Sequence, residues 1–223
     1  MTFDRAVSVV LTICAVAIAG TVVRREFVVA PPPSANPQKL TATRLPDWKK
    51  MEAFGQEIVL GNGQLRLVEF TDLECPFCKA FQTQLAKVQA ELGAAIGVTV
   101  IHTPLSMHKF AKPAAQAAAC AWAQGKGAKF IDVAFAAQDS LASVSTVQLA
   151  ERSGVTDLRT FKTCLDGPEA EAIALGKHLA DSLDFHSTPI VILNGWRFSR
   201  PPNETELRQA VGRVIAGRDP VGN

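Results

Sequence analysis

The chain has 223 residues, of which 48% are hydrophobic and 20% are charged, a balance typical of one globular domain with an appendage. Its 23 basic and 21 acidic residues are interspersed and leave a net charge of +2. No sustained field therefore favours nucleic acid or a lipid surface as a partner, and we expect neither.

Residues 1–25 form the first predicted segment. Residues 6–23 are uncharged and mostly apolar, a run that is just long enough to span a bilayer. The same run contains Ala17-Ile-Ala19, which fits the cleavage site of a signal peptide. The segment is thus either a transmembrane anchor or a cleaved signal peptide. Arg24 and Arg25 slightly favour a cytoplasmic domain, but the thiol chemistry described below favours export.

Residues 26–56 are predicted to be a proline-rich spacer followed by a short helix. Five prolines between residues 30 and 47, without apolar periodicity, are typical of an extended, semi-rigid spacer. The short helix is expected over residues 47–56, with Trp48 and Phe54 as its anchors.

The domain proper is predicted over residues 57–217, and it begins with a hairpin. Glu57–Leu60 and Gln64–Phe70 flank Gly61-Asn62-Gly63, and Asn-Gly between two β-rich runs is the strongest short-range hairpin signal. The second arm is apolar enough to be a central strand.

An amphipathic helix is predicted from Cys75 to Leu92. Its apolar residues recur at spacings of three and four, and Pro76 suits the first turn, where a missing N–H costs nothing. A strand is expected over residues 97–105, ended by Pro104.

The remaining elements complete an α/β fold. Residues 108–184 have a helical, alanine-rich pattern broken by glycines. A strand at 188–195 and a second at 196–198 are joined by Asn-Gly, and a helix at 205–216 precedes a tail at 218–223. This order predicts a mixed central sheet flanked by helices, with an inserted all-helical subdomain at about 108–184.

Cys75 and Cys78 are the candidate reactive residues. A helix N-terminus lowers the pKa of a thiol because unpaired N–H groups favour negative charge there. Cys75 lies at that end, so we expect it to be the exposed, attacking thiol. Cys78, one turn later, is expected to be buried and to resolve the mixed disulfide that Cys75 forms.

A metal site is the main alternative for these two cysteines. A tetrahedral zinc site usually recruits a second close pair of ligands, which the chain lacks. The four histidines are scattered singly, at His102, His108, His178 and His186. No metal and no other cofactor is predicted.

Over residues 58–216 the chain resembles the DsbA-like thiol-disulfide oxidoreductases of the thioredoxin-fold superfamily. The motifs that carry this resemblance are Val68-Glu-Phe-Thr-Asp-Leu-Glu-Cys-Pro-Phe-Cys78, Pro104-Leu-Ser-Met-His108 and Ser187-Thr-Pro-Ile-Val-Ile-Leu-Asn-Gly195. The resemblance implies a thioredoxin fold with a helical insertion, an enzyme, and no cofactor.

The resemblance also implies roles for residues outside the dithiol. The bond between Thr188 and Pro189 is expected to be cis, with its loop against the dithiol and the backbone of Thr188 bonded to an incoming peptide. Glu69 is expected as a buried carboxylate that moves the proton of Cys78, and burial would raise its pKa toward neutrality. An edge-exposed Glu69 is the alternative.

Phe77 marks a departure from the strongly oxidising relatives, which carry histidine between the cysteines. One source of thiolate stabilisation is then absent, and we predict a less oxidising couple in which Phe77 contacts substrate. The spacer is too small for the N-terminal domain of the isomerase dimers, so a monomer is expected.

Two histidines have open roles. His186, three residues before Pro189, either tunes Cys75 or caps the preceding helix. His108 either organises the start of the helical block or touches substrate.

Cys120 and Cys164 both fall in the helical block. Related proteins often carry a second, structural bridge here, so the resemblance implies a disulfide between them. Two buried free thiols are the alternative.

These observations predict an exported, membrane-tethered oxidoreductase that exchanges a Cys75–Cys78 disulfide with cysteine pairs of exported proteins, as an oxidant. It would be periplasmic or extracytoplasmic, and a membrane or soluble redox partner would recycle it. The alternatives are a reductase of exported thiols and a copper or zinc carrier using Cys75, Cys78 and His186.

Overall fold

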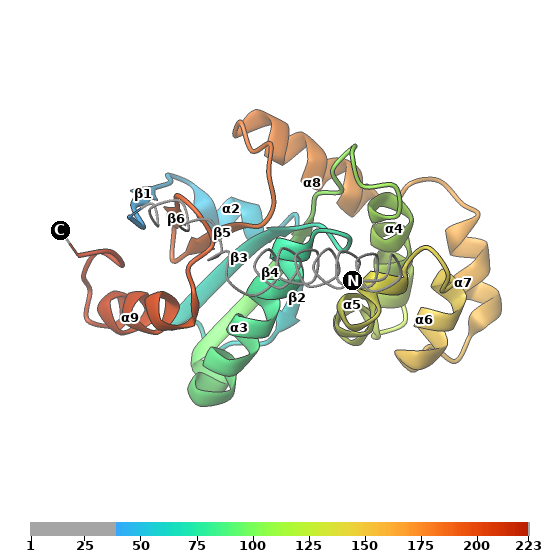
Figure 1. Ribbon diagram of the computed structural model, residues 1–223, viewed down its shortest axis with the longest axis horizontal. Coiled ribbons are helices and arrows are strands. Elements are labelled where there is room, and N and C mark those ends of the chain that lie inside the picture. Colours follow the sequence, from blue (N-terminus) through green and yellow to red (C-terminus); the bar gives the residue numbers. More distant parts are fainter. Residues whose placement is uncertain (1–38, 223) are drawn as a thin grey trace, which may run out of the picture. The chain divides into compact units, whose positions relative to one another are not determined.

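The structure, a computed structural model, describes residues 39–222 (Figure 1). The apolar segment predicted over residues 1–25 lies outside the described residues. Between residues 39 and 222, no helix combines the length and the apolar character needed to cross a membrane. The domain is one compact unit that starts at Leu40.

A six-stranded mixed sheet forms the centre of the domain, in the order β1-β6-β5-β3-β4-β2. Among the described strands, β3 and β4 are the one parallel pair, and the other neighbours pair antiparallel. The strands are β1 (Ala42–Arg44), β2 (Gln56–Val59), β3 (Leu65–Thr71), β4 (Ile96–His102), β5 (Ile190–Leu193) and β6 (Trp196–Phe198).

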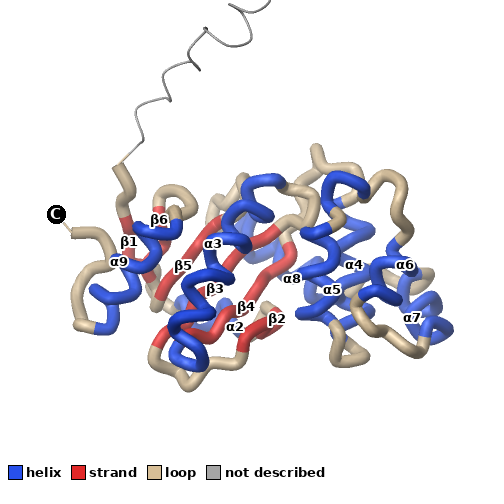
Figure 2. Tube along the Cα trace, turned by 60° about the horizontal axis from the view of Figure 1, so that its bottom comes forward, coloured by secondary structure: helices blue, strands red, loops and turns tan. Residues whose placement is uncertain are grey.

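Helices cover both faces of this sheet (Figure 2). Side chains alternate along β3, so Leu67 packs against one helical layer while Val68 packs against the other. The layer at Leu67 consists of α3 (Pro76–Leu92) and α9 (Glu204–Ile215). The opposite layer consists of α2 (Trp48–Glu52) and α8 (Glu171–Ser182).

Four further helices form a lobe beyond the end of β4, seen at the right of Figure 1. They are α4 (Ala111–Trp122), α5 (Gly127–Ala136), α6 (Thr146–Arg152) and α7 (Leu158–Leu165). Phe130 and Phe161 are fully buried at its centre, with ring centroids 6.4 Å apart. The predicted helical block is confirmed, and its last helix, α8, returns to the sheet.

The predicted hairpin around Gly61-Asn62-Gly63 was wrong. β2 pairs antiparallel with β4, so β4 lies between the two segments that were expected to pair. The turn instead runs against the start of β4: the N–H of Asn62 donates to the carbonyl of Ala94 at 2.7 Å. A Cβ at Gly61 would lie 2.3 Å from the backbone nitrogen of Gly97. Local turn chemistry was overridden by the burial of β3, which a central position between two strands provides.

The predicted spacer extended too far into the domain. Leu40 is buried in the core, and Ala42–Arg44 pair with Trp196–Phe198 as the edge strand β1. No proline lies between Pro37 and Pro46, so this stretch can donate its N–H groups to β6. The short helix ends at Glu52, because Gln56 already belongs to β2.

The second hairpin is confirmed. β5 and β6 pair antiparallel, and the turn between them has positive φ at both Asn194 (46°) and Gly195 (84°), as the favoured two-residue turn requires. The predicted last helix is also present, and its N-cap Asn203 forms a capping box with Glu206.

Candidate active site

The dithiol lies between the end of β3 and the first turn of α3. The strand ends at Thr71, and Cys75 is the N-cap of the helix, with Pro76 at its first position. The N–H of Cys78 donates to the carbonyl of Cys75 at 3.1 Å. This local order brings both sulfurs to the N-terminus of α3, where free N–H groups face them.

Cys75 is an acidic thiol. Its pKa falls from 9.0 to about 5. The main cause is that the Cys78 thiol donates a hydrogen bond to the Cys75 thiolate, and burial opposes this effect in part by raising the pKa. Thr188 and the backbone N–H groups of Cys78 and Phe77 lower the pKa further. At neutral pH Cys75 is therefore a thiolate, the nucleophilic form.

Cys78 behaves in the opposite way. Burial, its donated bond to Cys75 and the charges of Glu69 and Cys75 all raise the pKa of the Cys78 thiol well above its ordinary value. Its sulfur also accepts from the N–H of Asp72 at 3.4 Å. The two thiols are free rather than bonded, and they differ strongly in acidity.

The expected exposure of Cys75 was wrong. Only 3% of Cys75 is exposed, compared with none of Cys78. The loop before β5 covers it, and the Cys75 thiol donates to the carbonyl of Thr188 at 3.4 Å. The sulfur of Cys75 is therefore shielded on the side of this loop.

The Thr188–Pro189 bond is cis, and its loop lies against the dithiol. The Thr188 hydroxyl is buried and has no hydrogen-bond partner among the described residues. Because the Thr188 carbonyl already accepts from the thiol form of Cys75, this hydroxyl is the group that remains to donate to the thiolate.

Glu69 is a buried carboxyl beneath the dithiol. None of it is exposed, and it projects from β3 on the face that α3 covers. Burial raises its pKa from 4.5 to about 8, with the negative charge of Cys75 adding to the effect and contacts with Thr71 and Gln82 opposing it. One oxygen, Oε2, accepts from Gln82 at 2.5 Å. Glu69 is therefore largely neutral at pH 7 and can give up a proton close to that pH.

Asp72 organises a network that the sequence patterns did not reveal. Its carboxylate accepts from the N–H of Glu74 at 2.7 Å and from the N–H of Leu105 and Nδ1 of His108, both at 2.8 Å. Burial lowers the pKa of His108, but its bond to Asp72 and the nearby negative charges, Cys75 included, outweigh burial and raise it. His108 thus ties the loop before α4 to the dithiol loop, the structural alternative raised for it.

Gln138, in the helical lobe, is a second residue that the sequence did not mark. It is buried, and its amide donates to the carbonyls of Leu73 and Cys75 at 2.9 and 3.0 Å. Glu74 adds a further link, accepting from the N–H of Phe110. No periodicity or motif distinguishes these side chains, because their partners are backbone groups far away in sequence.

His186 does not join the site. Its side chain is 71% exposed and bonds Asp184 at 2.7 Å, at the end of the loop that follows α8. Across the described part of the chain, no group of three or more His, Cys, Asp or Glu side chains is arranged to hold a metal ion.

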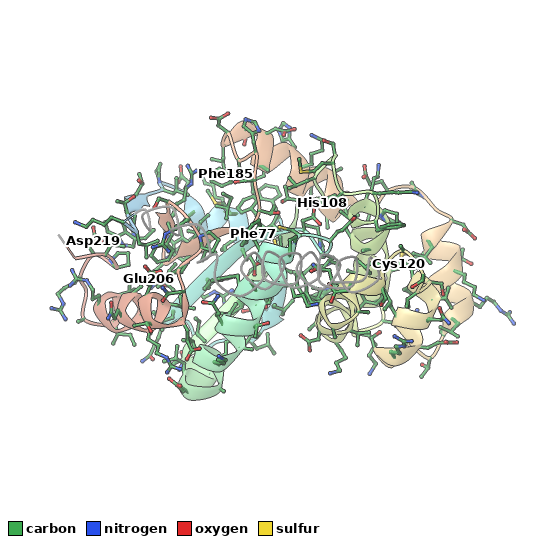
Figure 3. All side chains as sticks on the ribbon, viewed as in Figure 1. Phe77, His108, Cys120, Phe185, Glu206 and Asp219 are labelled. Atoms are coloured by element: carbon green, nitrogen blue, oxygen red, sulfur yellow. A yellow bond between two sulfur atoms is a disulfide. The ribbon has the colours of Figure 1, made fainter. Side chains whose placement is uncertain are left out.

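Apolar side chains are exposed beside the dithiol. Phe77 is 70% exposed in the first turn of α3, and Met107 is 79% exposed in the loop that Asp72 and His108 hold. Figure 3 shows Phe77 at the head of α3 and His108 toward α4, while Cys120 lies apart in the helical lobe. Two large apolar side chains are therefore exposed on segments that adjoin the dithiol.

The second cysteine pair is bonded. Cys120 in α4 and Cys164 in α7 form a disulfide with a Cα–Cα distance of 5.8 Å and a sequence separation of 44. The pairing is the one that the family resemblance implied, and it joins two helices of the lobe.

A family model described as thioredoxin matches residues 55–213. Among curated proteins, a Na(+)/H(+) antiporter, NhaA 3 of Salinispora tropica, is 32% identical over 152 residues, which are 67% of this chain and 23% of the antiporter. The chain spans about a quarter of the length of the curated relatives it matches.

Solved structures share the fold. BdbD from Bacillus subtilis, in its oxidised form, matches 81% of this chain and 100% of its own with a TM-score of 0.65 and 20% identity. Wolbachia pipientis α-DsbA1 matches 73% of this chain and 92% of its own with a TM-score of 0.62 and 18% identity. These likenesses identify the fold as that of the DsbA-like proteins.

Proposed function

Because the chain belongs to the thioredoxin family, we propose that it is a protein thiol-disulfide oxidoreductase that acts on exported proteins containing cysteine pairs. The observation that carries the proposal is that the pKa values of two neighbouring thiols shift in opposite directions: the pKa of Cys75 falls to about 5, while that of Cys78 rises. A metal ligand pair or two structural thiols would not need this difference.

As an oxidant, the protein starts with a Cys75–Cys78 disulfide. A substrate thiolate attacks the sulfur of Cys75, the bond to Cys78 breaks, and Cys78 leaves as a thiolate that takes a proton from Glu69. The second substrate thiolate then attacks the substrate sulfur of the mixed disulfide, and Cys75 leaves as a thiolate. A leaving thiol of low pKa leaves faster, so the second step is favoured by the pKa of Cys75.

The same groups support the oxidising direction of electron flow. Because Cys75 is a stabilised thiolate in the reduced protein, the reduced form is favoured and the couple is an oxidant. Phe77 works the other way, since it offers no positive charge between the cysteines. A reductase of exported thiols is therefore the second candidate.

Substrate would bind across Phe77, which is exposed in the helix turn that carries the dithiol, and across the Thr188–Pro189 loop, which contacts Cys75. A redox partner, in the membrane or soluble, would reoxidise the dithiol, and the protein would act as a monomer. Export fits the Cys120–Cys164 disulfide, since structural disulfides persist in oxidising compartments. Residues 6–23 would tether the domain to the membrane or be cleaved.

The deciding experiment measures the reduction potential of the full chain against glutathione and follows the oxidation of a reduced peptide with two cysteines. The oxidised protein should oxidise the peptide, and Cys78→Ser should accumulate a mixed disulfide through Cys75. A potential more reducing than glutathione would assign the reductase role. Tight stoichiometric binding of Cu(I) or Zn²⁺, lost in His186→Ala, would assign the metal carrier instead.

A further inference from the structure

Gln82 contacts the buried carboxyl of Glu69 and also borders a surface groove. It lies on α3 four residues after Cys78, so both side chains leave the helix on the same face. Its amide donates to Oε2 of Glu69 at 2.5 Å. The other oxygen of that carboxyl, Oε1, is buried and has no hydrogen-bond partner among the described residues.

The hydrogen bond decides where the proton of Glu69 resides. An oxygen that accepts from an amide N–H is the carbonyl oxygen of a neutral carboxyl, so the acidic proton belongs on Oε1. Oε1 is thus the oxygen left to serve Cys78, whose pKa the charge of Glu69 helps to raise. Without Gln82 the carboxyl could turn and carry its proton on either oxygen.

Gln82 also borders a groove of about 490 Å³ that is distinct from the face covering Cys75. Its walls come from three elements: Ile58 on β2, Thr83 and Ala86 on α3, and Phe135 on α5. The groove includes neither Phe77 nor the Thr188–Pro189 loop. A volume of this size admits water, and the lining is partly polar.

From these contacts we propose that Gln82 is a positioning residue for proton transfer between Glu69 and Cys78, and that Glu69 exchanges this proton with solvent through the groove that Gln82 borders. The inference rests on the proposed function. In the oxidising direction one proton moves from Oε1 of Glu69 to the departing Cys78 thiolate, and one solvent proton then restores the carboxyl. Because the groove lies off the dithiol face, a bound substrate would not block this exchange.

The charged groups around this path are few. Cys75 and Cys78 face Glu69 from α3, and Lys79 and Asp132 line the groove from α3 and α5. Lys79 is bonded to Asp139, which lies beyond the end of α5. A shift in the pH profile that follows Gln82 alone can therefore be assigned to its bond with Glu69.

Gln82→Met tests the positioning role because methionine keeps the length of the side chain and removes the amide. Gln84→Met is the matched control, on the same helix but away from both Glu69 and the groove. The full chain would be oxidised, mixed with a reduced dithiol peptide, and followed by stopped flow from pH 5 to 9. The infrared band of the Glu69 carboxyl, identified by its loss in Glu69→Gln, would report the pKa of Glu69 directly.

We expect Gln82→Met to raise the pKa of Glu69 above about 8, because the lost bond stabilised the carboxylate. The release of Cys78 should slow about tenfold at pH 7, because the proton is no longer held on Oε1 and the carboxyl is a weaker acid, and the fall in rate at high pH should move to higher pH with the pKa of Glu69. Alkylation of Cys75 by iodoacetamide should be unchanged, and Gln84→Met should match the wild type in every measurement. An unchanged pKa and rate in Gln82→Met, or an equal loss in Gln84→Met, would overturn the positioning role.

Ala86→Phe tests the groove, because Ala86 lines it. Ala90→Phe, on the outer surface of α3, is the control. Ala86→Phe should slow the release of Cys78 severalfold and leave the alkylation of Cys75 unchanged. Equal rates of Cys78 release in the two variants would rule out this route. Failure of the proposed function itself looks different, because the wild-type chain would then exchange no disulfide at all.

Discussion

The two cysteine pairs of this protein are both largely shielded from solvent, yet their surroundings direct them to opposite chemistry. Cys75 and Cys78 are free, at a helix N-terminus where N–H groups, a carboxyl and the Thr188 loop surround them. Cys120 and Cys164 are bonded to each other inside a lobe of alanine and phenylalanine side chains. Burial alone therefore does not decide whether a cysteine reacts; the polar groups around it do.

The largest effect is expected from Cys75→Ser, which should abolish disulfide exchange with a dithiol peptide. The serine hydroxyl is not a thiolate and cannot form the mixed disulfide. The matched variant, Cys164→Ser, should keep exchange measurable below its unfolding temperature. Full activity in Cys75→Ser would mean that Cys78 is the attacking thiol and that the pKa difference between the two has no catalytic use.

The lobe disulfide should matter for stability instead. Replacing both Cys120 and Cys164 by alanine should lower the free energy of unfolding by about 4 kcal/mol, because the bond closes a loop across a separation of 44 residues. Urea unfolding followed by circular dichroism measures this. A double variant that unfolded like the wild type but lost its exchange activity would show that the Cys120–Cys164 disulfide takes part in the reaction and does not stabilise the fold.

Glu69 should make stability depend on pH. Its folded pKa of about 8 lies above 4.5, so the neutral carboxyl stabilises the folded state at low pH, and this contribution is lost as pH rises through about 8. Glu69→Gln should therefore gain stability relative to the reduced wild type, by up to about 1.4 kcal/mol for each pH unit between 5 and 8.

Urea titrations of the reduced protein at several pH values check this prediction. Glu151→Gln, an exposed change on α6, serves as the control and should show no such trend. Parallel curves for Glu69→Gln and the wild type would mean that Glu69 is charged in the folded protein.

The smallest effect is expected from Phe77→His. Phe77 is exposed, so the change should cost little stability, and an imidazolium beside Cys75 should lower the pKa of that thiol further. A shift of one pKa unit would change the equilibrium constant with glutathione about tenfold, toward a more oxidising couple. Leu60→His, an equally exposed change after β2, should leave the equilibrium constant where it was.

Much of this site could be predicted from local patterns. The strand before Cys75, the helix after it and the burial of Cys78 follow from apolar spacing and from the position of Pro76. The β5–β6 turn follows from Asn194-Gly195, since both residues tolerate positive φ. These features depend on residues within a few positions of one another, so a sequence displays them directly.

Contacts between distant residues were the ones missed. Asn62-Gly63 carries a turn signal as strong as that of the second hairpin, but β4 occupies the place next to β3. Leu40 and the strand after it looked like spacer because only β6, about 155 residues later, provides their partner. The exposure of Cys75 was mispredicted for the same reason, since the Thr188 loop that covers it lies 113 residues away.

The sequence by itself determined the identity and order of the reactive thiols, because the Cys-x-x-Cys spacing and the helix that follows are local. The tertiary structure alone decided the surroundings of those thiols: the bonds of Gln82 to Glu69, of His108 to Asp72, and of Gln138 to the carbonyl of Cys75. The physical reason is that pKa values respond to burial and to charges a few ångströms away, whatever their distance along the chain.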